Sequence, residues 1–584
     1  MLSGHNIQRS VIGVLAIALI LVVACGSAAA PNAASSGEEA QPAALRMTPT
    51  AVPVRSAALS KGGPAAGTLR IALEEVGPPR WTPSTQRAPQ NSINNTTFLE
   101  SIWQKADDGA LKGILLESWG LDATGTVWTL KFREGIPFHY DYGEFTARDF
   151  KWTMENSVAE GTTDSQAPNF QRQFVAEGGG MQLLDDYTLQ VNTVEAAVDF
   201  TWQLTMAATP QMGKGIFSQA YWKDVGPEKA STQRAVGTGP WRSISHESGG
   251  IWEFEAMADH WRKTPEFARL EYRQIADEST RLANFLAGEL DTAQLNTESI
   301  AELESRCSDC KFMATLGGQL FVNIHGQMYI DREDLPTPRN GDLPWVSASP
   351  DPDSPEWDRA RKVRLAMNHA IDRDLLVETL FRGRGTPAHV YGWLGQESRM
   401  ADLANLRYEY DPDLAKDLLA QAGYPGGFEI GLALSNPPNR VAIQAAEIVT
   451  AMWEEVGIRA YVTRQPMGQL PDRSWVGVYS GGRSPDPEPG SAFNVFRSAS
   501  AVSYGLEHPI VEELLNSAVS KADEEARYED YRKVSRFLFE NAVTIPTVNV
   551  FRVWPVGTRI DEWDMPCCVA HVPSNLEYMP HRAN

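Results

Sequence analysis

A strand–helix–strand pattern late in the chain constrains the fold more than any other feature of the sequence. Apolar residues alternate from Phe428 to Leu434, as in a strand with one buried face. A helix with one apolar face follows and ends at Gly457, after which residues 458–462 begin another strand. This spacing is that of a βαβ crossover, in which the strands are parallel and the helix packs on the sheet. The pattern therefore predicts an α/β unit.

Helical patterns precede this unit. Apolar residues recur at helical spacing within Val363–Leu376, and a further helix begins with Asp411 as its N-cap and ends at Gly423. From about Thr68 to Leu295 the pattern changes to short strands with interspersed helices, and Val127–Arg133 is one such strand. The chain therefore predicts two α/β lobes, the first rich in strands.

Length and charge limit the possible functions. The roughly 500 residues after the N-terminal region are about three times a typical domain, which predicts at least two lobes. A net charge of -22 argues against nucleic-acid binding and against a surface that adheres to anionic lipid. The sequence contains no GxSxG, HExxH, Walker or GxGxxG motif that would indicate a known enzyme class. We therefore predict no catalytic residue and no cofactor.

The N-terminus has the features of an export signal. The apolar run Val11–Ala24 is shorter than the ~20 residues that a membrane-spanning helix needs, and Cys25 follows it directly. This arrangement resembles the lipobox of bacterial lipoproteins, in which the cysteine sulfur takes a diacylglycerol and the chain is cut before it. The alternative is an ordinary signal peptide with an incidental cysteine. The segment after Cys25, to residue 67, is rich in Ala, Pro, Ser and Gly, which predicts a disordered tether.

Besides Cys25, the chain has two close pairs of cysteines: Cys307 with Cys310, and Cys567 with Cys568. An exported chain is in a compartment where disulfides persist, and four cysteines allow three pairings that the sequence does not distinguish. A four-thiolate zinc site is the alternative. Adjacent cysteines are poor tetrahedral ligands, so we predict disulfides and no metal.

Four blocks of the sequence resemble those of one family. They span Leu115–Ser157, Val236–Trp241 (VGTGPW), Val363–Leu376 (VRLAMNHAIDRDLL) and Tyr410–Phe428 (YDPDLAKDLLAQAGYPGGF). In this order, they resemble the family 5 extracellular solute-binding proteins of ABC transporters, the group that binds dipeptides, oligopeptides and nickel. The resemblance extends over nearly everything from Thr68 to about Pro555.

The resemblance implies a type II, periplasmic-binding-protein-like α/β fold: a two-lobed clam-shell with lobe two inserted into lobe one. We expect the strands that cross between the lobes at Gln319–Gly326 and Thr544–Trp554. The implied division is a signal peptide with lipobox (1–24), a lipid-anchored disordered linker (25–67), lobe one (68–320 and 546–584) and lobe two (321–545). Cys307 and Cys567 both lie outside the insert, so a disulfide between the two cysteine sets would stay within lobe one.

Most of the family blocks predict scaffold and not a binding site. Gly237 and Gly239 indicate a turn that needs permissive backbone angles. Thr146 is a plausible N-cap. Asp372 and Arg373 are candidates for a local ion pair, which when exposed would contribute only about 0–1 kcal/mol.

The resemblance also indicates where a ligand would bind. Peptide-binding relatives carry, in a loop of lobe two, an aspartate that pairs with the free amine of the peptide. The matching segment is Ser474–Gly490, in which Val478 and Tyr479 stand at about the position of that acid. Asp486 is the nearest acid downstream. Arg483 would place a cation there, suited to a carboxylate or phosphate.

Other side chains are candidates for ligand contacts. Trp475 and Tyr479 flank the same loop, and Trp81 follows the first strand, where relatives also line the cleft. Gln319 and Asn323 are polar residues on the outgoing crossing strand. A role in the hydrophobic core is the alternative for each aromatic residue.

These observations favour an exported receptor. We expect a monomer anchored by lipid to the outer face of the cell membrane or in the periplasm, which captures a small ligand and delivers it to an ABC permease. A peptide is the favoured ligand, with an oligosaccharide or another carboxylate-bearing solute as the alternative. From another class, the alternative is a secreted hydrolase with an unrecognised site.

Overall fold

In the computed structural model of the protein, the described residues are 65–77, 81–84, 93–94, 97–105, 111–122, 124–160, 162, 167–197, 205–206, 209–331, 342–397, 399–436, 440–466, 477–483, 489–498, 500, 503–521, 523–561, 563 and 573–582. Within these ranges, no helix has both the length and the apolar character needed to cross a bilayer. The predicted export signal, Cys25 and the tether lie outside the described residues.

The first sheet of the chain has the strand order β10–β11–β12–β1–β13. Strand β1 runs parallel to β12 and β13, while β11 is antiparallel to both β10 and β12. Trp241, Trp252 and Tyr272 are fully buried in its hydrophobic core, which we call the first core. The strands are β1 (Thr68–Leu73), β10 (Trp241–His246), β11 (Ile251–Ala256), β12 (Arg269–Gln274) and β13 (Thr292–Ala293).

A second, antiparallel sheet has the order β4–β5–β7–β6. Its strand β5 confirms the predicted strand, because Trp128, Leu130 and Phe132 are buried while the residues between them are more exposed. The strands are β4 (Leu116–Leu121), β5 (Val127–Phe132), β6 (Gly180–Leu183) and β7 (Thr188–Asn192). Helix α2 (Ala147–Ser157) has Thr146 as its N-cap, as predicted, and the Thr146 backbone N–H donates to the Asp149 carboxylate at 3.0 Å.

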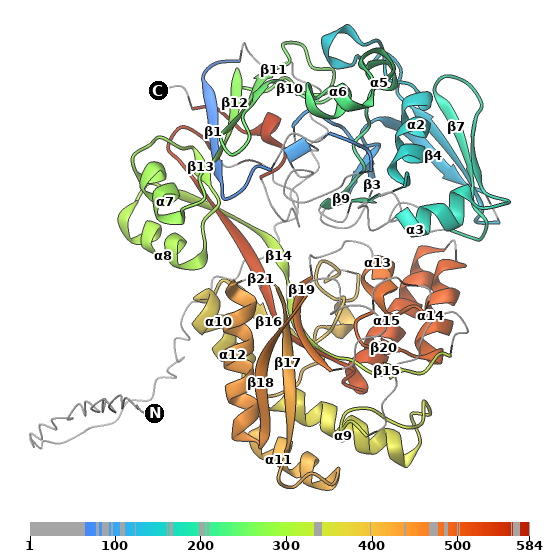
Figure 1. Ribbon diagram of the computed structural model, residues 1–584, viewed down its shortest axis with the longest axis vertical. Helices are drawn as coiled ribbons and strands as arrows, with labels where there is room; N and C mark the ends of the chain where they lie inside the picture. Colours follow the sequence, from blue (N-terminus) through green and yellow to red (C-terminus); the bar gives the residue numbers. More distant parts are fainter. Residues whose placement is uncertain are drawn as a thin grey trace, which may run out of the picture. The chain divides into compact units, whose positions relative to one another are not determined.

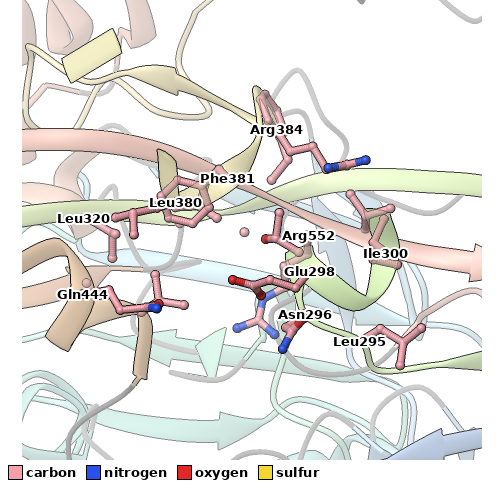
Figure 2. A pocket seen from close by; sticks show the side chains of 18 of the residues that line it. Leu295, Asn296, Glu298, Ile300, Leu320, Leu380, Phe381, Arg384, Gln444 and Arg552 are labelled. Atoms are coloured by element: carbon pink, nitrogen blue, oxygen red, sulfur yellow. The ribbon is translucent and has the colours of Figure 1, made fainter. Parts of the chain in front are cut away.

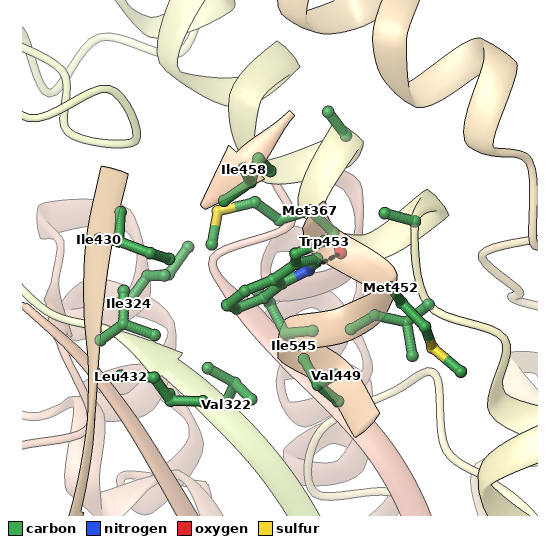
Figure 3. Close-up of a cluster of buried hydrophobic side chains, with 14 of the residues drawn as sticks. Val322, Ile324, Met367, Ile430, Leu432, Val449, Met452, Trp453, Ile458 and Ile545 are labelled. Atoms are coloured by element: carbon green, nitrogen blue, oxygen red, sulfur yellow. Dashed lines mark hydrogen bonds between the residues drawn. The ribbon is translucent and has the colours of Figure 1, made fainter. Parts of the chain in front are cut away.

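The predicted βαβ crossover is confirmed in the third sheet, whose order is β16–β21–β14–β19–β17–β18. Strands β17 and β18 are parallel, and α12 connects them. Trp453 of α12 is fully buried in the core beneath the sheet and its indole N–H donates to the Met367 carbonyl at 2.9 Å (Figure 3). The elements are β14 (Lys311–Ile324), β16 (Gly385–Pro387), β17 (Phe428–Asn436), α12 (Arg440–Glu455), β18 (Ile458–Pro466), β19 (Val478–Arg483) and β21 (Thr544–Val556).

Strands β14 and β21 join two hydrophobic cores. They pair antiparallel along almost their whole length and lie side by side in Figure 1. At one end, Trp554 and Val556 belong to the first core. At the other, Val322 and Ile545 belong to the core around Trp453, which we call the second core. The predicted segment Thr544–Trp554 lies within β21, whereas β14 begins at Lys311, earlier than the predicted Gln319; each strand passes from one core to the other.

Helices pack around these sheets. Asp411 is the N-cap of α11, as predicted, and its carboxylate accepts from the Leu414 backbone N–H at 2.8 Å. The helical pattern in Val363–Leu376 spans two helices, because α9 ends at His369 and α10 begins at Arg373. The longer helices outside the βαβ unit are α7 (Glu278–Leu286), α8 (Thr297–Arg306), α9 (Pro355–His369), α10 (Arg373–Phe381), α11 (Pro412–Gln421), α14 (Pro509–Val519) and α15 (Glu524–Glu540). Shorter helices and strands are α3 (Ala167–Phe170), α5 (Gln219–Val225), α6 (Pro227–Thr232), α13 (Pro489–Phe493), β2 (Trp103–Lys105), β3 (Leu111–Gly113), β8 (Thr205–Met206), β9 (Thr209–Gly213), β15 (Gln327–Met328) and β20 (Leu506–Glu507).

The glycines of the VGTGPW block are needed for a reason other than the predicted one. A β-carbon at Gly237 would lie 1.9 Å from the Phe98 carbonyl oxygen, and one at Gly239 would lie 2.3 Å from the Thr97 carbonyl oxygen. Neither glycine has a positive φ. Close approach of two backbone segments therefore requires glycine here, and not a left-handed conformation.

The predicted ion pair between Asp372 and Arg373 is wrong. The Asp372 carboxylate caps α10 by accepting from the Leu375 backbone N–H at 2.9 Å. The Arg373 guanidinium points inward and donates to backbone carbonyls, among them those of Ala388 at 2.8 Å and Pro546 at 2.9 Å. The two residues therefore have separate structural roles. Asp372 caps the start of a helix, and Arg373 joins a loop to β21.

A disulfide joins Cys307 to Cys310. It lies between the end of α8 and the start of β14, so it fixes the turn that leads into the crossing strand. Neither cysteine is therefore available to pair with Cys567 or Cys568, both of which lie outside the described residues. The alternatives of a bridge between the two sets and of a four-thiolate zinc site are contradicted by this bond.

Candidate functional site: a cavity beside the crossing strands

A cavity of about 950 Å³ lies beside the middle of the crossing strands. This volume is in the range of small-molecule binding sites. Its walls are contributed by strands β14, β19 and β21 and by helices α8, α10 and α12 (Figure 2). The lining residues are Glu74, Glu278, Gln294, Leu295, Asn296, Thr297, Glu298, Ile300, Gly317, Gly318, Gln319, Leu320, Leu380, Phe381, Arg384, Leu434, Val441, Gln444, Ser480, Gly481, Gly482, Val550, Phe551, Arg552, Val553 and Trp554.

The floor of the cavity is the part of the third sheet formed by β14, β21 and β19. Both β14 and β19 contribute a pair of adjacent glycines, Gly317–Gly318 and Gly481–Gly482. Because glycine has no side chain, these pairs leave backbone surface open to the cavity. Gly317 is a bulge residue: Leu316 lies opposite Phe551 and Gly318 opposite Val550, so Gly317 has no partner on β21.

One wall is polar and is held rigidly. Asn296 is the N-cap of α8 and accepts from the Ser299 backbone N–H at 2.9 Å. The Glu278 carboxylate accepts from the Asn296 backbone N–H at 2.6 Å and from its side-chain amide at 2.8 Å. The buried Arg281 guanidinium donates to the Gln294 carbonyl at 2.7 Å. These bonds fix the loop between β13 and α8 against the cavity.

The opposite wall is mostly apolar. Leu380 and Phe381 come from the end of α10, Leu434 from the end of β17, and Val441 from the first turn of α12. Phe381 and Leu434 are buried in the second core, so they are fixed in place. A ligand in the cavity would therefore meet hydrogen-bonding groups on one side and hydrocarbon on the other.

Two arginines line the cavity, and their surroundings differ. Arg384 forms an ion pair with Glu304 of α8, which neutralises its charge. The guanidinium of Arg552, on β21, makes no hydrogen bond or ion pair with any residue that the structure describes. Burial lowers the pKa of Arg552, with no opposing charge as a contributing cause.

The structure brings together two of the segments that the sequence singled out. Strand β19 pairs with β14, so that Arg483 lies opposite Gln319 and Tyr479 lies opposite Asn323. The structure describes the backbone of Tyr479 and Arg483 but not their side chains. Gln319 lines the cavity, and its amide N–H group donates to Asn549 Oδ1 at 2.9 Å.

The other predicted contacts are placed elsewhere or not described. Trp81 is buried in the first core against Trp252, and Asn323 is completely buried; neither lines the cavity. Trp81 therefore lies in the core, which was the alternative given for it, and a ligand contact by either residue stays a prediction. Trp475 and Asp486 lie outside the described residues.

Sequence reasoning missed Arg552, Arg384 and most of the α8 wall. A signal for Arg552 was present, because a charged residue stands in the middle of the apolar returning strand VNVFRVW. The glycine pairs in β14 and β19 were a second signal, since glycine within a strand often marks a close approach of a ligand. Among the described residues, no group of three or more His, Cys, Asp or Glu is placed to hold a metal ion.

Known proteins share this architecture. Residues 110–503 match the model of the bacterial extracellular solute-binding proteins, family 5 Middle. Heme-binding protein A of Haemophilus influenzae is 25% identical over 517 residues, which cover 80% of this chain and 84% of that protein. Glutathione-binding protein GsiB of Pectobacterium atrosepticum is 23% identical over 378 residues, 64% of each chain.

A solved structure gives the same result for the fold. The periplasmic binding protein DppA from Helicobacter pylori, in complex with the peptide STSA, superposes with a TM-score of 0.65 at 18% identity, over 89% of this chain and 98% of that one. The mixed α/β fold, with two long strands that join two cores, is that of the type II periplasmic binding proteins. The chain belongs to the bacterial extracellular solute-binding proteins of family 5.

Proposed function

We propose that this protein is an extracytoplasmic receptor that captures a small ligand in the cavity and delivers it to an ABC transporter permease. The observation that carries the proposal is the position of the cavity, which is lined by residues from both cores around β14 and β21. In this proposal, residues 68–320 and 546–584 form lobe one, residues 321–545 form lobe two, and the lobes close on the ligand. Closure must be favoured by contacts that the ligand makes with both walls.

A peptide is the ligand that we favour. The relatives include a glutathione-binding protein and a binding protein solved with a peptide, and glutathione is itself a modified tripeptide. The cavity offers a polar wall for a peptide backbone and an apolar wall for side chains. Heme is the second candidate, since the heme-binding relative matches over most of both chains. An oligosaccharide remains the alternative ligand. The aromatic residues of the 474–490 segment would favour it.

The receptor acts by binding and release, without covalent chemistry and without a catalytic residue or cofactor. Native mass spectrometry of the protein from its source would reveal a co-purified ligand, and we expect a peptide. Titration of the isolated protein should then change its tryptophan fluorescence without consuming the ligand, because Trp554 lines the cavity. Turnover of any peptide or glycan would instead support the hydrolase alternative.

We further propose that Cys25 carries the lipid anchor and that the receptor is monomeric. The support for the anchor is the sequence alone: an apolar run that ends at Ala24, directly before the cysteine, and a following segment rich in Ala, Pro, Ser and Gly. Cys25→Ser should release the protein from the membrane or stall its processing, with ligand affinity unchanged. Normal processing and unaltered membrane retention in that variant would refute the anchor.

A further inference from the structure

From the environment of Arg552, we infer that the ligand carries an anionic group, a carboxylate or a phosphate, and that the Arg552 guanidinium binds it at the floor of the cavity. This inference rests on the proposed function, because it assigns a contact within the same site. It adds to that function a residue and a chemical class of ligand.

The backbone of β14 makes room for this side chain. Arg552 lies opposite Thr315 in the ladder, directly beside the bulge at Gly317. A β-carbon at Gly317 would lie 2.8 Å from Arg552 Cγ and 3.1 Å from the Arg552 backbone nitrogen. The stem of Arg552 therefore packs over the space that the glycine leaves. Bulges of this kind commonly redirect a side chain next to a binding site.

Other inward-facing arginines of this protein have partners, which sets Arg552 apart. Arg364 donates to the carbonyls of Asn541 and Trp345, at 2.8 and 2.9 Å. Arg262 is held by two carboxylates, those of Glu100 at 3.0 Å and Glu577 at 2.5 Å. Arg552 is half-buried, and its guanidinium has no such partner among the described residues. Partial burial makes an unpaired charge unfavourable, so the site favours binding of a counter-ion.

The rest of the cavity is compatible with an anion near Arg552. Figure 2 shows Arg552 among the lining side chains, with Asn296 and Glu298 near it in that view. Three acidic residues line the cavity. The Glu278 carboxylate is hydrogen-bonded to Asn296. Glu74 and Glu298 are exposed to solvent, where their charge is screened. The first turns of α8 and α12 also face the cavity, and helix N-termini favour negative charge.

The apolar wall limits the rest of the ligand. Leu380, Phe381 and Leu434 line the cavity and would contact hydrocarbon. A small inorganic anion would leave this surface unused. The geometry therefore fits an organic anion with an apolar portion, such as a peptide with a free C-terminal carboxylate.

The test compares peptides that differ only in charge. The probes are synthetic tri- to pentapeptides with free C-terminal carboxylates and the same peptides as C-terminal amides, titrated calorimetrically into the full chain. We expect the wild type to bind the free acids roughly 30-fold more tightly than the amides. This is the size of effect expected when a desolvated charge pair loses one partner. Arg552→Gln should bind acids and amides alike, and Arg552→Lys should keep part of the difference.

Arg148→Gln is the matched control. This exposed arginine of α2 is paired with Asp186 and does not line the cavity, so its removal should leave the preference for free acids unchanged within about 3-fold. Urea unfolding tests whether the Arg552→Gln variant is folded. Because Arg552 is an uncompensated cation, Arg552→Gln should resist urea at least as well as the wild type.

Each outcome decides the inference. Equal binding of acids and amides by the wild type, or an unchanged preference in Arg552→Gln, would overturn it while leaving the peptide proposal intact. If the wild type binds neither set, the peptide proposal fails, and succinate and inorganic phosphate become the probes. Saturable binding of either anion that is lost in Arg552→Gln would then support the inference, and no such binding would overturn it.

Discussion

Gly317 on β14 faces Arg552 on β21 so closely that a β-carbon at Gly317 would lie 2.8 Å from Arg552 Cγ. The two residues are distant in sequence, and the bulge in β14 brings them together. The glycine and the cation therefore form a single structural unit at the floor of the cavity. Changing the glycine should move the arginine.

Gly317→Ala should weaken ligand binding as well as the fold. The added methyl group would meet the stem of Arg552 and, at 3.1 Å, the Val550 carbonyl oxygen, so either the side chain or the strand must shift. Overpacking of this kind costs about 1–3 kcal/mol of unfolding free energy. Urea unfolding measures the loss of stability, and the peptide titrations measure the loss of preference for free acids.

Gly426→Ala is the control for this substitution. Gly426 is exposed, and a β-carbon there would meet no atom within 4 Å. We expect less than about 0.5 kcal/mol of change. If Gly317→Ala behaves like this control in both assays, Gly317 does not position Arg552.

The parts of the fold that repeat a local pattern could be predicted from sequence. The crossover around α12 follows from alternation and helical spacing, and the N-caps at Thr146 and Asp411 follow from residue type. Gly237 and Gly239 were recognised as special, but their cause was not, because a clash with Phe98 depends on a contact between distant segments.

The candidate site was harder to predict for the same reason. Gln319 was predicted as a contact because it is a polar residue on a recognisable crossing strand, and it lines the cavity. Arg552 is equally visible in the sequence, but its importance lies in the missing partner and in the bulge at Gly317, which only the paired strands reveal. Trp81 lies in the first core, which was the alternative given for it, because the sequence does not show which way an aromatic residue after a strand faces.

The stability of the protein should decrease as the pH falls below neutrality, because buried histidines hold the VGTGPW block. The imidazoles of His139 and His260 are 2.8 Å from the carbonyl oxygens of Gly239 and Thr238. Burial lowers the pKa of each histidine to about 4. An unfolded histidine titrates near 6.5, so between these values the unfolded chain binds protons that the folded chain does not. Stability is therefore full above about pH 7 and falls toward pH 4.

His139→Gln tests this contribution, since glutamine can still donate to the Gly239 carbonyl but does not titrate. Between pH 7 and pH 5, the unfolding free energy of the wild type should fall by roughly 1–2 kcal/mol more than that of the variant. Urea midpoints at several pH values provide the measurement. Parallel pH profiles for both proteins would argue against a role for His139.

Arg262 should be essential for the stability of the first sheet. Its guanidinium joins two buried carboxylates, Glu100 and Glu577, which are distant in sequence. Arg262→Met would leave both acids without a cation, which we expect to cost about 3–5 kcal/mol. Arg459→Met is the matched control, because the pair of Arg459 with Glu429 is exposed and should contribute at most about 1 kcal/mol. Similar urea midpoints for the two variants would contradict this prediction.

The disulfide between Cys307 and Cys310 should contribute modestly to stability. It closes a loop with a sequence separation of 3, and so short a loop removes little entropy from the unfolded chain, about 2 kcal/mol in the chain-entropy model. The double variant Cys307→Ser and Cys310→Ser should therefore fold and bind ligand, with a correspondingly lower unfolding free energy. A reducing agent should lower the unfolding free energy of the wild type to that of the double variant. If the reducing agent lowers the wild type further than that, or also lowers the variant, Cys567 and Cys568 form a stabilising bond as well.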